Sequence, residues 1–82
     1  MTPPSQELLA TDLRDLGLTS LAGRVLEGRI STAQTLAEVA RQRGVRQRLL
    51  LRASTPADEE RLMAWCEKAT AIIDRHRDWQ PA

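Results

Sequence analysis

The stretch that decides the fold runs from residue 55 to residue 79 and reads TPADEERLMAWCEKATAIIDRHRDW. Thr55 can cap a helix, and Pro56 suits the first helical position, where its missing N–H leaves no hydrogen bond unmade. Acidic residues follow in the first turn and basic residues fill the last turns, which is the order that the helix dipole favours. These signals predict one long helix from about residue 56 to residue 79.

Apolar residues on this helix repeat at alternating spacings of three and four, which is typical of a seam buried against other helices. Two interpretations of the seam stay open. In the first, the helix packs across the preceding helices as the main element of the core. In the second, its distal half projects and pairs with a second copy, which places Ile72, His76 and Trp79 at a dimer interface. The seam consists of Leu62, Trp65, Ala69, Ile72, His76 and Trp79.

Upstream of the long helix, Gly, Ser and Thr divide the chain into shorter candidate helices at residues 5–16, from 19 or 20 to about 27, from 32 to Gly44, and 46–53. Gly17 suits the left-handed turn after residue 16, Thr19 or Ser20 can cap the second helix, and Ser31 or Thr32 can cap the third. In the first of these, leucines 8, 9, 13 and 16 share one face. Strand formers are few, and good helix formers dominate. The sequence therefore predicts an all-α fold: a compact bundle of four to five helices, the last being the longest. We expect a single domain over residues 5–79, with disordered tails at 1–4 and 80–82.

Length and composition exclude several classes of protein. The chain has 82 residues, of which 41% are hydrophobic and 28% charged. One small domain is all that so few residues can build. No apolar run approaches the roughly 18 residues of a membrane span. Cys66 has no partner for a disulfide, and the N-terminus lacks the features of a secretory signal, so we expect a cytoplasmic protein.

Charge is unevenly distributed along the chain. Residues 24–52 carry seven arginines against two glutamates, whereas the flanking segments are mildly acidic and the whole chain has a formal charge of +1. The planar guanidinium fork of Arg suits phosphates and base edges. The alternative is that these arginines only form a solvated face.

The segment from Leu36 to Thr55 resembles the helix-turn-helix of DNA-binding regulators. Ala40 supplies the small residue where two crossing helices touch, Gly44 the turn, and Val45 the apolar plug behind it. Arg43, just before the turn glycine, departs from the family pattern, in which this residue is usually apolar. The resemblance implies a DNA-binding or regulatory protein whose second helix lies in the major groove of double-stranded DNA. It assigns base reading to Arg46, Gln47 and Arg48, and phosphate contacts to Arg41, Arg43 and Arg52.

The alternative function is that of a small helical adaptor or inhibitor, such as phages, plasmids and secretion systems encode. It would bind another protein through exposed leucines, Leu51 above all, and through the last helix. Charge geometry discriminates between the two functions. DNA binding requires the arginines on one continuous face without acidic neighbours, whereas a protein partner requires an uncovered apolar patch.

Enzyme chemistry is not expected. Cys66 and His76 lie about 15 Å apart if both are on one helix, which is too far for a nucleophile pair. No further Cys or His completes a metal site. The sequence thus predicts no catalytic residues, metal, cofactor, small-molecule substrate or membrane contact.

Overall fold

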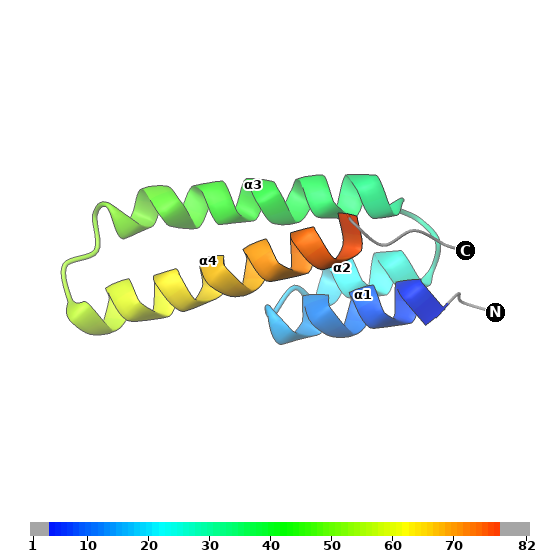
Figure 1. Cartoon of the computed structure of the whole chain (residues 1–82), viewed down its shortest axis with the longest axis horizontal. Helices are drawn as coiled ribbons and strands as arrows, with labels where there is room; N and C mark the ends of the chain where they lie inside the picture. Colours follow the sequence, from blue (N-terminus) through cyan, green and yellow to red (C-terminus); the bar gives the residue numbers. More distant parts are fainter. Residues whose placement is uncertain (1–3, 78–82) are drawn as a thin grey trace.

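The structure, a computed structural model, describes residues 4–77. Over this range it is all-α, with four helices: α1 (Pro4–Asp15), α2 (Thr19–Leu26), α3 (Thr32–Leu50) and α4 (Pro56–Arg77) (Figure 1). The predicted fold class is confirmed, and α4 is the longest helix with 22 residues. Of the predicted tails, residues 1–3 and 80–82 lie outside the described residues, and so does Trp79. Pro4, assigned to the first tail, begins α1.

Local signals place the starts of the two long helices. Ser31 and Gln34 form a capping box before α3: the Ser31 hydroxyl accepts from the Gln34 N–H at 3.1 Å, and the Gln34 side chain accepts from the Ser31 N–H at 3.2 Å. Before α4, the Thr55 hydroxyl accepts from the Asp58 N–H at 3.2 Å. Both starts agree with the sequence.

The end of α1 was predicted correctly, whereas the start of α2 was not. Gly17 follows α1 with a φ of +80°, a left-handed conformation that glycine adopts without a Cβ clash. The expectation that Thr19 or Ser20 caps the second helix is wrong. Leu18 is the N-cap of α2, and its side chain forms no capping hydrogen bond.

The bend predicted at Gly44 is wrong, because α3 continues through this residue to Leu50. Gly44 does not have a positive φ, unlike Gly17 and Gly28. A glycine inside a helix costs only about 1 kcal/mol relative to alanine, and the good helix formers on either side outweigh that. The separate helix expected over residues 46–53 is therefore the last part of α3. The two crossing helices expected within residues 36–55 are not formed.

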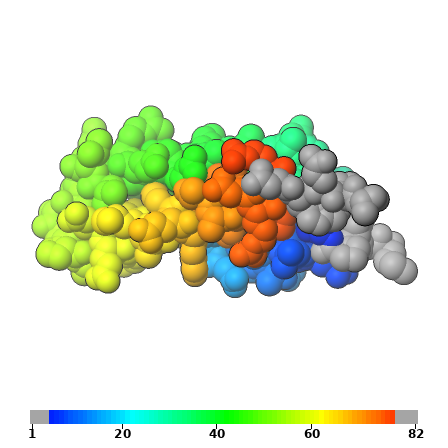
Figure 2. Space-filling view, in the orientation of Figure 1, coloured from blue at the N-terminus to red at the C-terminus, as the bar shows by residue number. Residues whose placement is uncertain are grey.

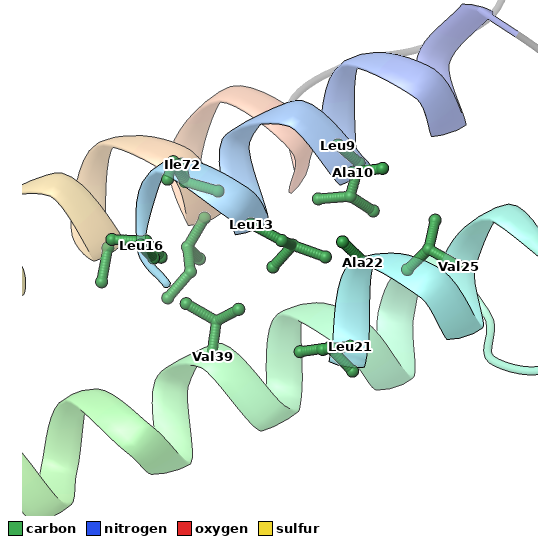
Figure 3. Packing of buried hydrophobic residues seen from close by; sticks show 11 residues of the cluster. Leu9, Ala10, Leu13, Leu16, Leu21, Ala22, Val25, Val39 and Ile72 are labelled. Atoms are coloured by element: carbon green, nitrogen blue, oxygen red, sulfur yellow. The ribbon is translucent and has the colours of Figure 1, made fainter. Parts of the chain in front are cut away.

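The four helices form two antiparallel hairpins that pack together at one end of the molecule. The short hairpin is α1–α2 and the long one is α3–α4 (Figure 1). Their core contains Leu9 and Leu13 of α1, Leu16 just after this helix, side chains of α2, and Val39 and Ile72 of the long hairpin (Figure 3). Leu8, which shared their predicted face, is exposed instead.

The core fills only half of the long hairpin. The buried residues of α3 are Thr35 and Val39, and the buried residues of α4 all lie between Ala69 and His76. No residue in the range 41–68, which the structure describes completely, is buried. We call this range the hairpin tip, and the rest of the described chain the body. The tip consists of two helices and their connection.

Candidate interaction surface

The hairpin tip exposes large apolar side chains. Leu51 is 87% exposed, Leu49 49% and Met63 45%. Two helices alone cannot enclose such side chains, since each needs neighbours on several sides to leave water. The ends of α3 and α4 form one end of the molecular surface in Figure 2, in green and yellow. The uncovered apolar side chains expected of a protein-binding module are therefore present at this end.

Two shallow grooves lie on the tip, one on each helix. The α3 groove is lined by Val45, Arg48 and Leu49 of this helix and by Arg52, two residues after its end. The α4 groove is lined by Pro56, Glu59, Glu60, Met63, Ala64 and Glu67. Each groove follows the spacing of one face of a single helix. Each therefore combines an exposed apolar side chain with charges of one sign.

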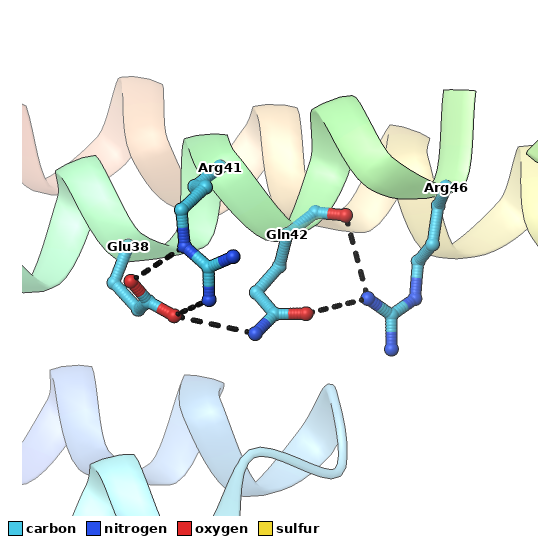
Figure 4. A network of polar contacts seen from close by, with 4 residues as sticks. All are labelled: Glu38, Arg41, Gln42 and Arg46. Atoms are coloured by element: carbon cyan, nitrogen blue, oxygen red, sulfur yellow. Dashed lines mark hydrogen bonds and ion pairs between the residues drawn. The ribbon is translucent and has the colours of Figure 1, made fainter. Parts of the chain in front are cut away.

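Three of the six residues assigned to DNA are engaged within the chain. Arg41 forms a bidentate ion pair with Glu38, with its Nε 3.0 Å from the carboxylate (Figure 4). Arg46 donates to the Gln42 side chain at 3.0 Å, and Gln42 in turn donates to Glu38. Arg43 donates to the Thr70 hydroxyl at 2.9 Å. These contacts engage all three guanidinium groups, although the Arg41 side chain is still 61% exposed.

Glu38 sits among these contacts as an acidic neighbour. The hydrogen bonds from Arg41, and next those from Gln42, lower the pKa of Glu38 from 4.5 to about 2. The same ion pair raises the pKa of Arg41. Glu38 is therefore ionised at neutral pH and offsets the positive charge of this part of α3.

Arg46 and Trp65 mark the base of the tip. The Arg46 guanidinium lies 3.8 Å from the centre of the Trp65 ring, which is cation–π geometry. The Trp65 Nε1–H donates to the Leu16 carbonyl at 2.9 Å, and the ring packs against the core. Trp65 thus links the tip to the body, and the Arg46 guanidinium is held over the Trp65 ring.

The remaining DNA candidates are available to a partner. Gln47, Arg48 and Arg52 are exposed, and their side chains form no hydrogen bond or ion pair with the described part of the chain. Of the six residues assigned to DNA, only these three have side chains open to a partner; Gln47 and Arg48 lie on α3, and Arg52 lies just after it. The arginines therefore do not form the single continuous face, free of acidic neighbours, that the DNA hypothesis required.

In the sequence, the acidic residues 58–60 at the start of α4 are explained by a solvated helix face and by helix-start electrostatics. Asp58 fits that explanation and also pairs with Arg61 one turn on. Glu59, Glu60 and Glu67 are exposed, and within residues 4–77 their side chains have no partner. Glu67 follows Glu60 by seven residues and Glu59 by eight, so all three lie on one face of the helix. This spacing could have indicated an acidic helix face.

The predicted dimer-interface residues on α4 lie inside the body. Ile72 and His76 are buried, and the His76 Nε2 is 2.7 Å from the carboxylate of Asp12 on α1. Arg75 donates to the same carboxylate at 3.2 Å. Up to Arg77, the distal half of α4 packs across α1 and does not project. Leu51 is the one predicted interface residue among residues 4–77 that is exposed.

No protein-family model matches this chain, and comparisons with curated protein sequences and with solved structures found no match. Among the described residues, none of the helices has the length and apolar character needed to cross a lipid bilayer. The same residues contain no cluster of three or more His, Cys, Asp or Glu side chains suited to a metal ion.

Proposed function

We propose that this chain is a small helical adaptor that binds another protein through its hairpin tip. The observation that carries the proposal is the absence of any buried residue across residues 41–68, combined with the exposure of Leu49, Leu51 and Met63. A partner that covers these side chains would remove apolar surface from water, the main favourable term in protein association. The body supplies the stable platform that holds the tip in place.

The charges of the tip support a protein partner over a nucleic acid. A polyanion gains from Arg48 and Arg52 but is repelled by Glu59, Glu60 and Glu67 on the other helix of the same tip. A protein surface can present both signs and match both helices. Leucine and methionine also contribute more to a protein interface than to a contact with the phosphate backbone.

Affinity capture from a native lysate, with and without nuclease, tests the proposal. The wild-type chain should retain a specific protein after nuclease treatment, and a Leu49→Asp/Leu51→Asp double variant should lose it. Leu8→Asp is the matched control, because Leu8 on α1 is 48% exposed and lies outside the tip. Loss of the partner in the control, or retention in the tip variant, would contradict the assignment of the surface.

Binding of double-stranded DNA is the second candidate, favoured by the three open side chains Gln47, Arg48 and Arg52 at the end of α3 and just after it. Without crossing helices, such binding would rest on phosphate contacts and would be strongly salt-dependent. Mobility shifts at about 50 mM salt, compared with those of an Arg48→Ala/Arg52→Ala variant, test this candidate. A shift that the variant abolishes supports DNA binding, and no shift of the wild type at this salt concentration eliminates it.

A further inference from the structure

The two grooves of the hairpin tip differ in charge but share a layout. In the α3 groove, Leu49 lies between Arg48 and Arg52. In the α4 groove, Met63 lies among Glu59, Glu60 and Glu67. Each groove therefore has an apolar centre flanked by charged side chains, positive on α3 and negative on α4.

None of these flanking charges is neutralised within the chain. Over residues 4–77, neither arginine of the α3 groove pairs with an acid, and none of the three glutamates of the α4 groove pairs with a base. In contrast, Arg41 and Arg61, which neighbour the grooves, each form an ion pair with an acidic residue of their own helix. Open charges also occur elsewhere on the described chain, at Glu7, Arg14, Asp15 and Lys68, but only in the two grooves do several of one sign flank an exposed apolar side chain.

We propose that a second copy of this chain docks on the tip, with the α3 groove of one copy against the α4 groove of the other. The inference rests on the proposed function, that the tip binds protein, and names the partner. Leu49 and Met63 of the two copies would cover one another, while the open arginines face the open glutamates. The near-zero net charge of the chain, +1, leaves little overall repulsion between copies.

The contact joins two different surfaces, so it is heterologous. Each protomer has one groove of either kind, and a first contact leaves one of each unused. The assembly therefore grows by repetition of the same contact or closes when the geometry brings the free grooves together. A useful consequence for testing is that the two halves of the contact can be disabled independently.

Sedimentation equilibrium of the full chain over a concentration series is the experiment. The wild type should self-associate, and raising the salt from about 50 to 500 mM should weaken the association several-fold, because exposed charges are screened. Arg48→Glu/Arg52→Glu and Glu59→Lys/Glu67→Lys variants should each raise the dissociation constant by at least about tenfold, since like charges then face one another. Arg14→Glu, an exposed reversal on α1, is the control and should leave association unchanged.

Mixing the two reversed variants gives the decisive result. In the mixture, the reversed α3 groove of one variant matches the reversed α4 groove of the other, and the two unchanged grooves match as in the wild type. The mixture should therefore form complexes that contain the two variants in equal numbers and that neither variant forms alone. Circular dichroism of each variant, showing wild-type helicity, excludes loss of folding. A monomeric wild type at every concentration overturns the inference, and so does a mixture that stays monomeric.

Failure of the inference can be told from failure of the proposed function. A wild type that stays monomeric but captures a different protein through Leu49 and Leu51 overturns the self-docking inference and leaves the proposed function standing. A chain that neither associates with itself nor captures any protein overturns both.

Discussion

The body and the hairpin tip use the same kind of helix with opposite results. In the body, four helix segments surround Leu9, Leu13 and Val39, which are almost completely buried. In the tip, two helices face each other and leave Leu49 and Leu51 in solvent. Burial of an apolar side chain requires cover on several sides, and α1 and α2 supply that cover only to the body. The long hairpin therefore extends beyond the part of its surface that α1 and α2 cover.

Leucine truncations in the two regions should show the largest contrast. Leu13→Ala should lower the free energy of unfolding by about 2–5 kcal/mol, because it removes a completely buried side chain and leaves a cavity. Leu49→Ala should change it by less than about 0.5 kcal/mol. Urea denaturation at low protein concentration measures both values. Equal losses would show that the tip is packed as tightly as the body.

Removal of Asp12 tests how much the polar contacts between α1 and α4 contribute to the stability of the body. Asp12→Ala takes away the carboxylate that meets His76 at 2.7 Å and Arg75 at 3.2 Å, and should cost about 1–3 kcal/mol. Asp74→Ala is the matched control, since Asp74 forms an exposed pair with Arg77 on the same helix and such pairs contribute at most about 1 kcal/mol. Similar effects of the two variants would mean that the buried cluster adds little.

The continuity of α3 between the two regions can be tested at Gly44. Gly44→Ala should raise the free energy of unfolding by about 0.5–1 kcal/mol, because alanine favours the helix and a Cβ there meets no atom within 4 Å. At Gly17, where φ is +80°, the same substitution should destabilise. Destabilisation at Gly44 would instead reveal a bend at this residue. Chemical denaturation of the two variants decides the matter.

The smallest effect is expected at Glu38, where α3 passes from the body into the tip. Its pKa of about 2 in the folded chain lies below the value of 4.5 that it has when unperturbed. Its contacts therefore contribute stability above pH 4.5, and this contribution is lost as the pH falls toward 2. Glu38→Gln should show a shallower fall of Tm across this window than the wild type. Parallel curves for the two proteins would remove Glu38 from the acid response.

Features that depend on neighbours in the chain could be predicted from the sequence. The all-α class, the Ser31 cap, the Thr55–Pro56 start and the turn at Gly17 all follow from residues within one helical turn of each end. The path of the chain at Gly44 could not be predicted in this way. A glycine can form a bend and can also be tolerated inside a helix. The contacts that hold α3 at this point involve distant residues, such as that of Arg43 with Thr70, 27 residues away.

The interaction surface could be predicted only in part, because it too depends on contacts between distant residues. Exposure of Leu51 could be predicted because residues 49–51 are a run of three leucines, of which at least one must point away from the local core. The seam of α4 indicated which face is apolar, but not which half of that face is covered. Coverage depends on how far α1 and α2 reach along the long hairpin. Because α1 and α2 cover only the last part of α4, Ile72 and His76 are buried and Met63 is exposed.

The contact of Asp12 with His76 joins residues 64 positions apart and has a consequence for the order of folding. During synthesis, α1 and α2 are complete long before the last turns of α4 exist. Distant partners make a core late to form, because the intervening chain must first be brought into a loop. A nascent chain that stops short of residue 69 lacks all the buried residues of α4, and it therefore leaves the inner faces of its first two helices without that cover.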